Sequence, residues 1–251
     1  MENKTQKLDP TVGDKIKIIN NKWSFSSKNC AVNFRQHVKK SIPNYDEGHE
    51  LICQISDYFV RNICSSKKNF CYDLGSSLGD LSNKLASRHE SIDNLYWVGI
   101  DKEPQMIDLA NEYKKNLSNL DFHEQDILSY PYEKSTFFVC NYILQFLSKC
   151  KRSELIKTIY ENLLPGGALI VYEKVIESQV FFHDILSNLY INYKFSKGFS
   201  AQEILLKQES LRGVLKPMTR QENLNLLDSA GFSEVSLIAK SLFFEGYLAV
   251  K

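Results

Sequence analysis

Short apolar runs alternate with amphipathic segments from about residue 69 onward, and this alternation leaves few folds open to the 251-residue chain. The apolar runs LYWVGI (95–100) and TFFVCN (136–141) are separated from their neighbours by segments with helical spacing, such as EPQMIDLANEYKKNL (103–117). Near-continuous apolar strands joined by helices are typical of a parallel sheet that is covered on both faces. The pattern therefore predicts an α/β fold.

The C-terminal stretch EVSLIAKSLFFEGYLAV (234–250) departs from this alternation. It contains two strand-like runs with no room for a crossover helix, which predicts an antiparallel hairpin. A doubly wound, mostly parallel seven-stranded sheet that ends in such a hairpin is the layout of Rossmann-like, class I methyltransferase domains. We expect this domain over 66–251, a polar leader and helical cap over 1–65, and a helical insertion at about 178–215 that breaks near Lys197 and Gly198.

Composition limits the class of protein. The 31 basic and 30 acidic residues nearly balance, so no basic footprint for nucleic acid is present, and we expect no direct contact with nucleic acid. The six cysteines form no C-x-x-C pair and no zinc spacing, which favours core thiols such as Cys53 and Cys140 over a metal site. The N-terminal stretch is polar and no run reaches membrane-spanning length, which favours a cytoplasmic protein without membrane contact.

The stretch CYDLGSSLGD (71–80) resembles a nucleotide-binding turn between a strand and a helix. The dinucleotide pattern G-x-G-x-x-G would start at Gly75, but Ser77 occupies its second glycine position. A side chain there would crowd a pyrophosphate, and Asp80 at the helix start would oppose one. S-adenosylmethionine has no phosphate, and a serine can hydrogen-bond its polar groups. The loop therefore favours S-adenosylmethionine over NAD.

Polar side chains follow four successive apolar runs: Asp73, Asp101, Asp126 and Asn141. In open α/β sheets, ligands bind at the carboxyl ends of the strands. A carboxylate at Asp101 can accept both ribose hydroxyls, and one at Asp126 can read an adenine edge. Each residue alone could serve as a turn or cap residue, and Asp101 could be the N-cap of the following helix. Their joint placement favours a ligand site.

Further motifs recur in an order that generic methyltransferases do not share: SIPNY (41–45), YDLGSSLG (72–79), GID (99–101), LQFL (144–147), LLPGGALIVYEK (163–174), GFSAQEILLKQESLRGVL (198–215) and AGF (230–232). From about Trp23 to the C-terminus, the chain resembles the carboxy-S-adenosyl-L-methionine synthase family. The resemblance implies an enzyme that converts S-adenosylmethionine and prephenate into carboxy-S-adenosylmethionine and phenylpyruvate. It also implies a homodimer whose product is used by a downstream carboxymethyltransferase of wobble uridine in tRNA.

The chemistry implied by the resemblance needs no protein nucleophile. Prephenate loses carbon dioxide and hydroxide, the hydroxide deprotonates the sulfonium methyl, and the resulting ylide captures the carbon dioxide. Such a reaction requires a dry pocket and close placement of the reactants. In keeping with this, none of the five histidines has a Ser/His/Asp-like arrangement, and His183 is the nearest candidate.

Ligand contacts follow from the matched motifs. The resemblance implies that Tyr45 contacts the ligand and that Asn141 faces the reacting end. The remaining implied contacts are the methionine side (Gly75, Ser76, Ser77), the ribose (Asp101, Lys102) and the adenine (Asp126, Ile127).

The insertion departs from the family pattern at one position. The family has Lys-Arg where this chain has Lys207-Gln208, and that arginine binds the carboxylate added to the cofactor. Three alternatives follow. Arg212, four residues on, could share a helical face with Gln208 and replace the arginine. Lys207 could bind the carboxylate without bidentate geometry. Alternatively, the protein is an ordinary methyltransferase or a non-carboxylating S-adenosylmethionine-binding protein. We favour the synthase, because Tyr45 and the insertion helix are retained.

Overall fold

One mixed sheet forms the centre of the molecule, in a computed structural model that describes residues 11–18, 22–60 and 67–251. Its strands lie in the order β3-β2-β1-β4-β5-β8-β7, and β8 runs antiparallel to both of its neighbours. The five strands β1 to β5 are mutually parallel and read as the apolar runs of the sequence. Their bounds are Asn69–Leu74 (β1), Leu95–Asp101 (β2), Leu120–Glu124 (β3), Ser135–Asn141 (β4), Leu163–Ile176 (β5), Glu234–Ser241 (β7) and Phe244–Val250 (β8).

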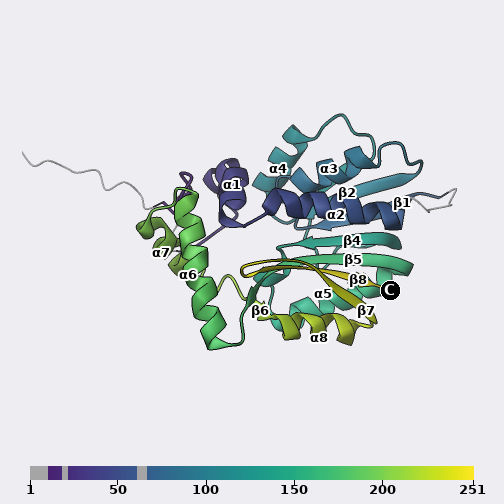
Figure 1. Cartoon of the computed structure of the whole chain (residues 1–251). Helices are drawn as coiled ribbons and strands as arrows, with labels where there is room; N and C mark the ends of the chain where they lie inside the picture. Colours follow the sequence, from purple (N-terminus) through teal and green to yellow (C-terminus); the bar gives the residue numbers. More distant parts are fainter. Residues whose placement is uncertain (1–10, 19–21, 61–66) are drawn as a thin grey trace, which may run out of the picture.

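Helices cover both faces of the sheet, as the apolar strands require (Figure 1). One buried cluster joins the strands to α2, α3 and α4, and a second joins them to α5 and α8. Cys53 lies in the first cluster and Cys140 in the second, so the prediction of core thiols is confirmed for both. The bounds are Tyr45–Val60 (α2), Asp80–Arg88 (α3), Pro104–Tyr113 (α4), Lys149–Asn162 (α5) and Arg220–Ala230 (α8).

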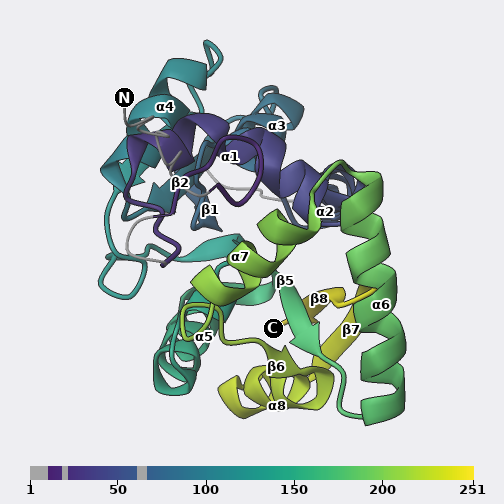
Figure 2. The same ribbon diagram turned by 90° about the vertical axis from the view of Figure 1, so that its left-hand side faces the viewer.

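The predicted insertion forms two helices, α6 (Val180–Ser196) and α7 (Ala201–Ser210), with the expected break at Lys197 and Gly198. Together with α1 (Lys28–Ser41) they gather at one end of the sheet, and Figure 2 shows α6 and α7 in front of that end. Helix α7 packs on a cluster that includes Trp23 and Leu78, so the insertion is tied to both the N-terminal segment and the glycine-rich turn.

The structure differs from the predicted elements in three places. An eighth strand, β6 (Met218–Thr219), adds to the expected seven by pairing with β5 over two residues. The composition of SIPNYDEGHE (41–50) predicts a turn, but α2 already starts within it, at Tyr45. The residues PGG (165–167) also predict a turn, but they lie within β5, where a register shift against β4 accommodates them. The spacing of EGHELICQISDYFVRNI (47–63) predicts a helix. The end of that helix, the start of the predicted leader and Cys64 lie outside the described residues.

Candidate functional site

A cavity of about 880 Å³ lies at the carboxyl ends of β1, β2 and β4 and is roofed by α6 and α7. It is bounded by residues of the N-terminal segment, the sheet and the insertion. Of the residues singled out from the sequence, its wall contains Tyr45, Asp73, Gly75, Ser76, Ser77, Asp101, Lys102, Asp126, Ile127, Asn141, His183, Lys207 and Gln208. The fold thus brings together motifs that are up to 163 positions apart, from Tyr45 to Gln208 (208 − 45).

The glycine-rich turn carries the chain from β1 across the edge of β2. Backbone N–H groups of Gly75 and Ser76 donate to the carbonyl of Ile100, at 2.8 and 3.0 Å. Gly75 has φ +72°, and a Cβ at this position would lie 2.7 Å from the side chain of Ile143. Only glycine fits this backbone without strain, because both the left-handed conformation and the close approach exclude a side chain.

Asp101 holds the turn in place. Its carboxylate accepts from the N–H of Ser77 at 2.9 Å and from the N–H of Glu103 at 3.0 Å. Burial raises the pKa of Asp101, and these two amides act in the opposite direction. Glu103 is the N-cap of α4, so the alternative of Asp101 as the N-cap is wrong. The carboxylate therefore fixes the conformation of the turn while remaining on the cavity wall.

The two serines of the turn differ in orientation. Ser77 adopts φ +51°, and its hydroxyl donates to Sδ of Met106 at 3.5 Å, so its side chain is engaged within the protein. The Oγ atom of Ser76 is buried and has no hydrogen-bond partner among the described residues. A buried hydroxyl on a cavity wall without a partner suits a polar ligand group, because an unmade hydrogen bond is costly. Ser76, rather than Ser77, has the free hydroxyl at this turn.

The end of β4 is held by a histidine that the sequence analysis missed. Asn141 Nδ2 donates to Nε2 of His49 at 2.9 Å, and the ring of His49 lies 4.4 Å from that of Tyr45. Burial lowers the pKa of His49 to about 3, so the imidazole is neutral and can accept. This bond uses the amide nitrogen of Asn141, which leaves its oxygen as the acceptor on the cavity wall. His49 follows Tyr45 by four residues in α2, a spacing that could have indicated it.

Two carboxylates near the turn are already engaged. Asp73 accepts from the hydroxyl of Ser82 at 2.6 Å, and burial raises its pKa to about 6. Asp80 forms a bidentate pair with Arg35, with N···O distances of 2.8 and 2.7 Å. The expected repulsion between Asp80 and a pyrophosphate is weakened by Arg35, which neutralises the carboxylate.

The residues expected at the adenine and ribose lie toward the rim. Asp126 is exposed and its Oδ1 accepts from the N–H of Leu128 at 2.9 Å, whereas Ile127 is buried beside it. Lys102 extends into solvent and lies 3.9 Å from a carboxylate oxygen of Glu103. One of these wall positions is thus apolar and the other two are polar, a combination that suits a ligand with a flat base and hydroxyls.

Of the three residues that could meet the added carboxylate, Lys207 and Gln208 lie on the cavity wall, whereas Arg212 does not line it. Helix α7 ends at Ser210, and Arg212 follows in a turn in which its N–H donates to the carbonyl of Glu209. Gln208 and Arg212 are both exposed. The Nζ atom of Lys207 lies 2.7 Å from the centroid of the Trp23 ring, and burial lowers its pKa well below the usual range.

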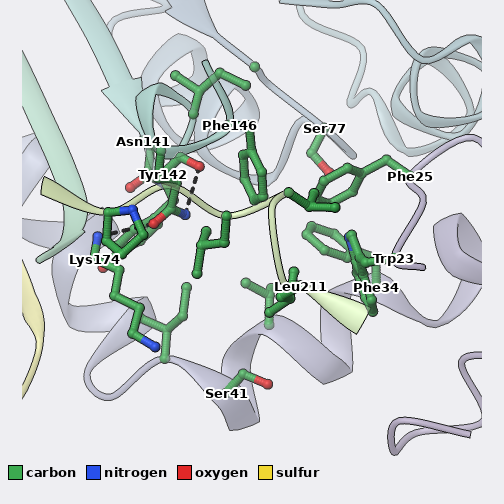
Figure 3. A pocket seen from close by; sticks show the side chains of 18 of the residues that line it. Trp23, Phe25, Phe34, Ser41, Ser77, Asn141, Tyr142, Phe146, Lys174 and Leu211 are labelled. Atoms are coloured by element: carbon green, nitrogen blue, oxygen red, sulfur yellow. Dashed lines mark hydrogen bonds between the residues drawn. The ribbon is translucent and has the colours of Figure 1, made fainter. Parts of the chain in front are cut away.

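Aromatic rings form one side of the cavity. Phe25 lies 5.5 Å from Trp23, 5.7 Å from Phe34 and 5.0 Å from Phe146, measured between ring centroids in edge-to-face contacts. Figure 3 shows these rings on one side of the pocket and Asn141, Tyr142 and Lys174 on the other. The cavity is therefore apolar on one side and lined with hydrogen-bonding and charged groups on the other.

Comparison with known proteins decides the family. A methyltransferase-domain family model matches residues 65–231. A carboxy-S-adenosyl-L-methionine synthase from Staphylococcus epidermidis is 32% identical over 229 residues, which cover 91% of this chain and 97% of that protein. The synthase from Campylobacter lari is 34% identical over 224 residues, which cover 89% of this chain and 92% of that protein. The chain belongs to the carboxy-S-adenosyl-L-methionine synthase family. The resemblance seen in the sequence motifs is thereby confirmed.

Solved structures confirm the fold of this synthase-family member. The structure of human N-acetylserotonin methyltransferase in complex with SAM matches 90% of this chain over 56% of its own length, with a TM-score of 0.60 and 19% sequence identity. The structure of a SAM-dependent methyltransferase from Methanosarcina mazei matches 78% of this chain over 96% of its own length, with a TM-score of 0.55 and 18% sequence identity. The predicted class I methyltransferase fold is therefore confirmed. Within the described residues, no helix is both long and apolar enough to span a bilayer.

Proposed function

We propose that this enzyme is a carboxy-S-adenosyl-L-methionine synthase that uses S-adenosylmethionine and prephenate and releases phenylpyruvate. The observation that carries this proposal is the cavity itself, in which the family's motifs meet under the helical insertion. Relatives that bear this name cover nearly the whole chain. The activity would be cytoplasmic, and the product would serve a carboxymethyltransferase of tRNA wobble uridine.

The residues around the glycine-rich turn suit the cofactor. Ser76 offers a buried hydroxyl without a partner, and the carboxylate of Asp101 can accept ribose hydroxyls beside its two amide bonds. Asp126 and Ile127 would flank the adenine. S-adenosylmethionine, when bound, supplies the sulfonium methyl that becomes carboxylated. Its reacting end would lie near the oxygen of Asn141, which His49 holds in a single orientation.

The protein's contribution to the reaction is placement and exclusion of water. The aromatic side of the cavity would exclude water from part of the bound ligands, and a site with less water strengthens every electrostatic interaction inside it. Carbon dioxide released beside the cofactor would be captured before it escapes only if both reactants share one enclosed space. The cavity between the sheet and the insertion would hold both reactants side by side.

Lys207 and Gln208 would meet the carboxylate of the product. Gln208 can donate a hydrogen bond but carries no charge. Burial disfavours the charged form of Lys207, but a bound carboxylate would favour it, and the lysine would then supply a point charge without the guanidinium fork. We therefore place recognition of this carboxylate on Lys207, with Gln208 as a neutral donor beside it. We assign Arg212 no part in it, because it does not line the cavity.

Restoring the arginine tests this assignment. We expect Gln208→Arg to tighten the binding of carboxy-S-adenosylmethionine by about tenfold, because a bidentate, charge-assisted pair adds about 1.5 kcal/mol. The affinity for S-adenosylmethionine, which lacks the carboxylate, should change by less than about twofold. Calorimetric titration with both compounds measures the two values. Arg212→Ala is the matched control and should leave both affinities unchanged; equal gains for both compounds in Gln208→Arg would contradict the assignment.

Product analysis separates the proposed function from its alternatives. Incubation with S-adenosylmethionine and prephenate should yield a cofactor heavier by one carbon dioxide, together with phenylpyruvate, by mass spectrometry. An ordinary methyltransferase would ignore prephenate and form S-adenosylhomocysteine with some acceptor. A binding protein would leave both compounds unchanged.

The exposed face of α6 suits a second copy of this chain. Val180, Phe181, Phe182, Ile185 and Leu189 have exposed fractions of 41% to 76%. A continuous apolar stripe at helical spacing is unfavourable in water and is typical of an interface. The family tends to form homodimers, so we propose that this stripe pairs with another protomer beside the roof of the cavity.

A charge on this stripe should dissociate the dimer. We expect Phe181→Glu to shift the molar mass in solution from dimer to monomer, because a carboxylate would have to lose its water at the centre of the apolar contact. Size-exclusion chromatography with light scattering measures the mass. Tyr58→Glu, at a position 80% exposed on α2, is the matched control and should remain dimeric. A monomeric wild type, or a dimeric Phe181→Glu, would refute the interface.

A further inference from the structure

Two lysines that the sequence analysis did not single out reach the cavity from different elements. Lys174 lies near the end of β5 and Lys194 lies near the end of α6, and both line the wall. Their Nζ atoms lie 5.0 and 4.7 Å from the centroid of the same ring, that of Tyr190. Figure 3 shows Lys174 on the side of the pocket that carries Asn141 and Tyr142, so the pair lies toward the expected reacting end.

Neither lysine has an acidic partner. The ion pairs among the described residues all involve other cations, and none joins Lys174 or Lys194 to a carboxylate within 4.0 Å. Lys194 is only 8% exposed. Burial lowers the pKa of both lysines to about 8, and the charge of Lys174 lowers that of Lys194 further.

Two cations without counter-charges, one buried (Lys194) and one half-buried (Lys174), are costly to a folded protein. Contact with the face of Tyr190 recovers part of that cost, but aromatic faces compensate a charge far less than a carboxylate does. Replacing either lysine with an apolar side chain of similar length would remove the cost. A ligand that brings its own negative charges would remove it as well.

We propose that Lys174 and Lys194 form a subsite for the carboxylates of a dianionic second substrate, each lysine taking one carboxylate. This inference deepens the proposed function and rests on it for the identity of that substrate, prephenate. The ring of Tyr190, which both lysines contact, would hold the two ammonium groups close to each other on the cavity wall. Since prephenate carries two carboxylates and phenylpyruvate one, decarboxylation leaves one lysine without a partner. The subsite therefore favours release of the product.

The test compares the affinity for prephenate between the wild type and the variants Lys174→Met and Lys194→Met. Calorimetric titration of prephenate into the complex with S-adenosylhomocysteine measures binding without turnover. We expect each variant to raise the dissociation constant for prephenate by about tenfold or more, because a charge-assisted contact is lost. The affinity for S-adenosylhomocysteine should stay within about twofold of the wild type. Lys174→Arg and Lys194→Arg, which keep the charge, should recover most of the affinity.

Lys197→Met is the matched control. Its Nζ atom lies 5.3 Å from the ring centroid of Tyr193, a similar contact, but Lys197 is exposed and lies outside the cavity wall. It should bind prephenate as the wild type does. The melting temperature provides a second readout. Lys194→Met should melt at or above the wild-type temperature, because it removes an uncompensated buried charge, whereas a lysine with a structural role would lower it.

The outcomes separate this proposal from the proposed function. Unchanged prephenate affinity in both methionine variants, or a marked fall in melting temperature, would overturn the subsite even if the wild type makes carboxy-S-adenosylmethionine. Conversely, prephenate binding that weakens in both methionine variants would support the subsite even if the wild type gives no carboxylated product, an outcome that would overturn the proposed function alone.

Discussion

Asp101→Ala should weaken the binding of S-adenosylhomocysteine by about 100-fold or more. The carboxylate accepts the N–H groups of Ser77 and Glu103, so its removal releases the glycine-rich turn as well as the expected ribose contact. Hydrogen bonds to a charged group are worth about 1.5 to 3 kcal/mol each, and a loss of about 2.7 kcal/mol already corresponds to 100-fold. Calorimetric titration measures the dissociation constant.

Two further variants sharpen the Asp101 experiment. Asp101→Asn keeps the shape but has a single acceptor oxygen, so we expect an intermediate loss of affinity. Asp108→Ala removes an exposed carboxylate on α4 outside the cavity and should bind as the wild type does. If Asp101→Ala is folded and binds within about threefold of the wild type, the carboxylate does not hold the cofactor.

Glu173→Ala should lower the free energy of unfolding by about 3 to 5 kcal/mol. Glu173 is 1% exposed, and its two oxygens accept the N–H groups of Leu144 and Gln145, both at 2.8 Å. Gln145 in turn accepts from the N–H of Lys174 at 3.2 Å. Alanine would leave two buried amides and the buried Arg152 without the carboxyl group that faces them. Urea unfolding measures the loss.

The loss of stability caused by a milder substitution, Glu173→Gln, should depend on pH. Burial raises the pKa of Glu173 from 4.5 to about 8, against the opposing influence of Arg152 and the two amides. A raised pKa means that the stabilising contribution is complete below pH 4.5 and is lost as the pH rises toward 8. The destabilisation caused by Glu173→Gln should therefore shrink over this range.

Glu90→Ala, at an exposed turn, is the control for Glu173→Ala and should change stability by less than about 0.5 kcal/mol. A loss below about 1 kcal/mol for Glu173→Ala would show that the carboxyl does not hold this segment.

The fold was predictable because its signals are local. Strands buried on both faces read as apolar runs, and the lack of space for a helix between 234 and 250 indicated the terminal hairpin. The short strand at Met218–Thr219 gave no signal, since two residues carry no periodicity. The bulge at 165–167 depends on its register against β4, which the sequence of one strand does not contain.

The candidate site was predictable at the sheet and less so at the insertion. Asp101 and Asn141 follow apolar strands directly, so their positions at the carboxyl edge followed from the fold class. Lys174 and Lys194 became part of the site only through the way α6 folds back over that edge. The position of Arg212 could not be read from the helical spacing, because α7 ends two residues earlier, at Ser210.

The origin of the added carboxylate tests the proposed function most directly. Prephenate labelled with carbon-13 at the ring carboxylate, incubated with the enzyme and unlabelled S-adenosylmethionine, should give carboxy-S-adenosylmethionine that carries the label and phenylpyruvate that does not. The reaction should be analysed by mass spectrometry in buffer with unlabelled bicarbonate, so that carbon dioxide lost to solution is diluted. Labelled cofactor product is the predicted result. Labelled carbon dioxide in solution with an unmodified cofactor, or no consumption of prephenate, would contradict it.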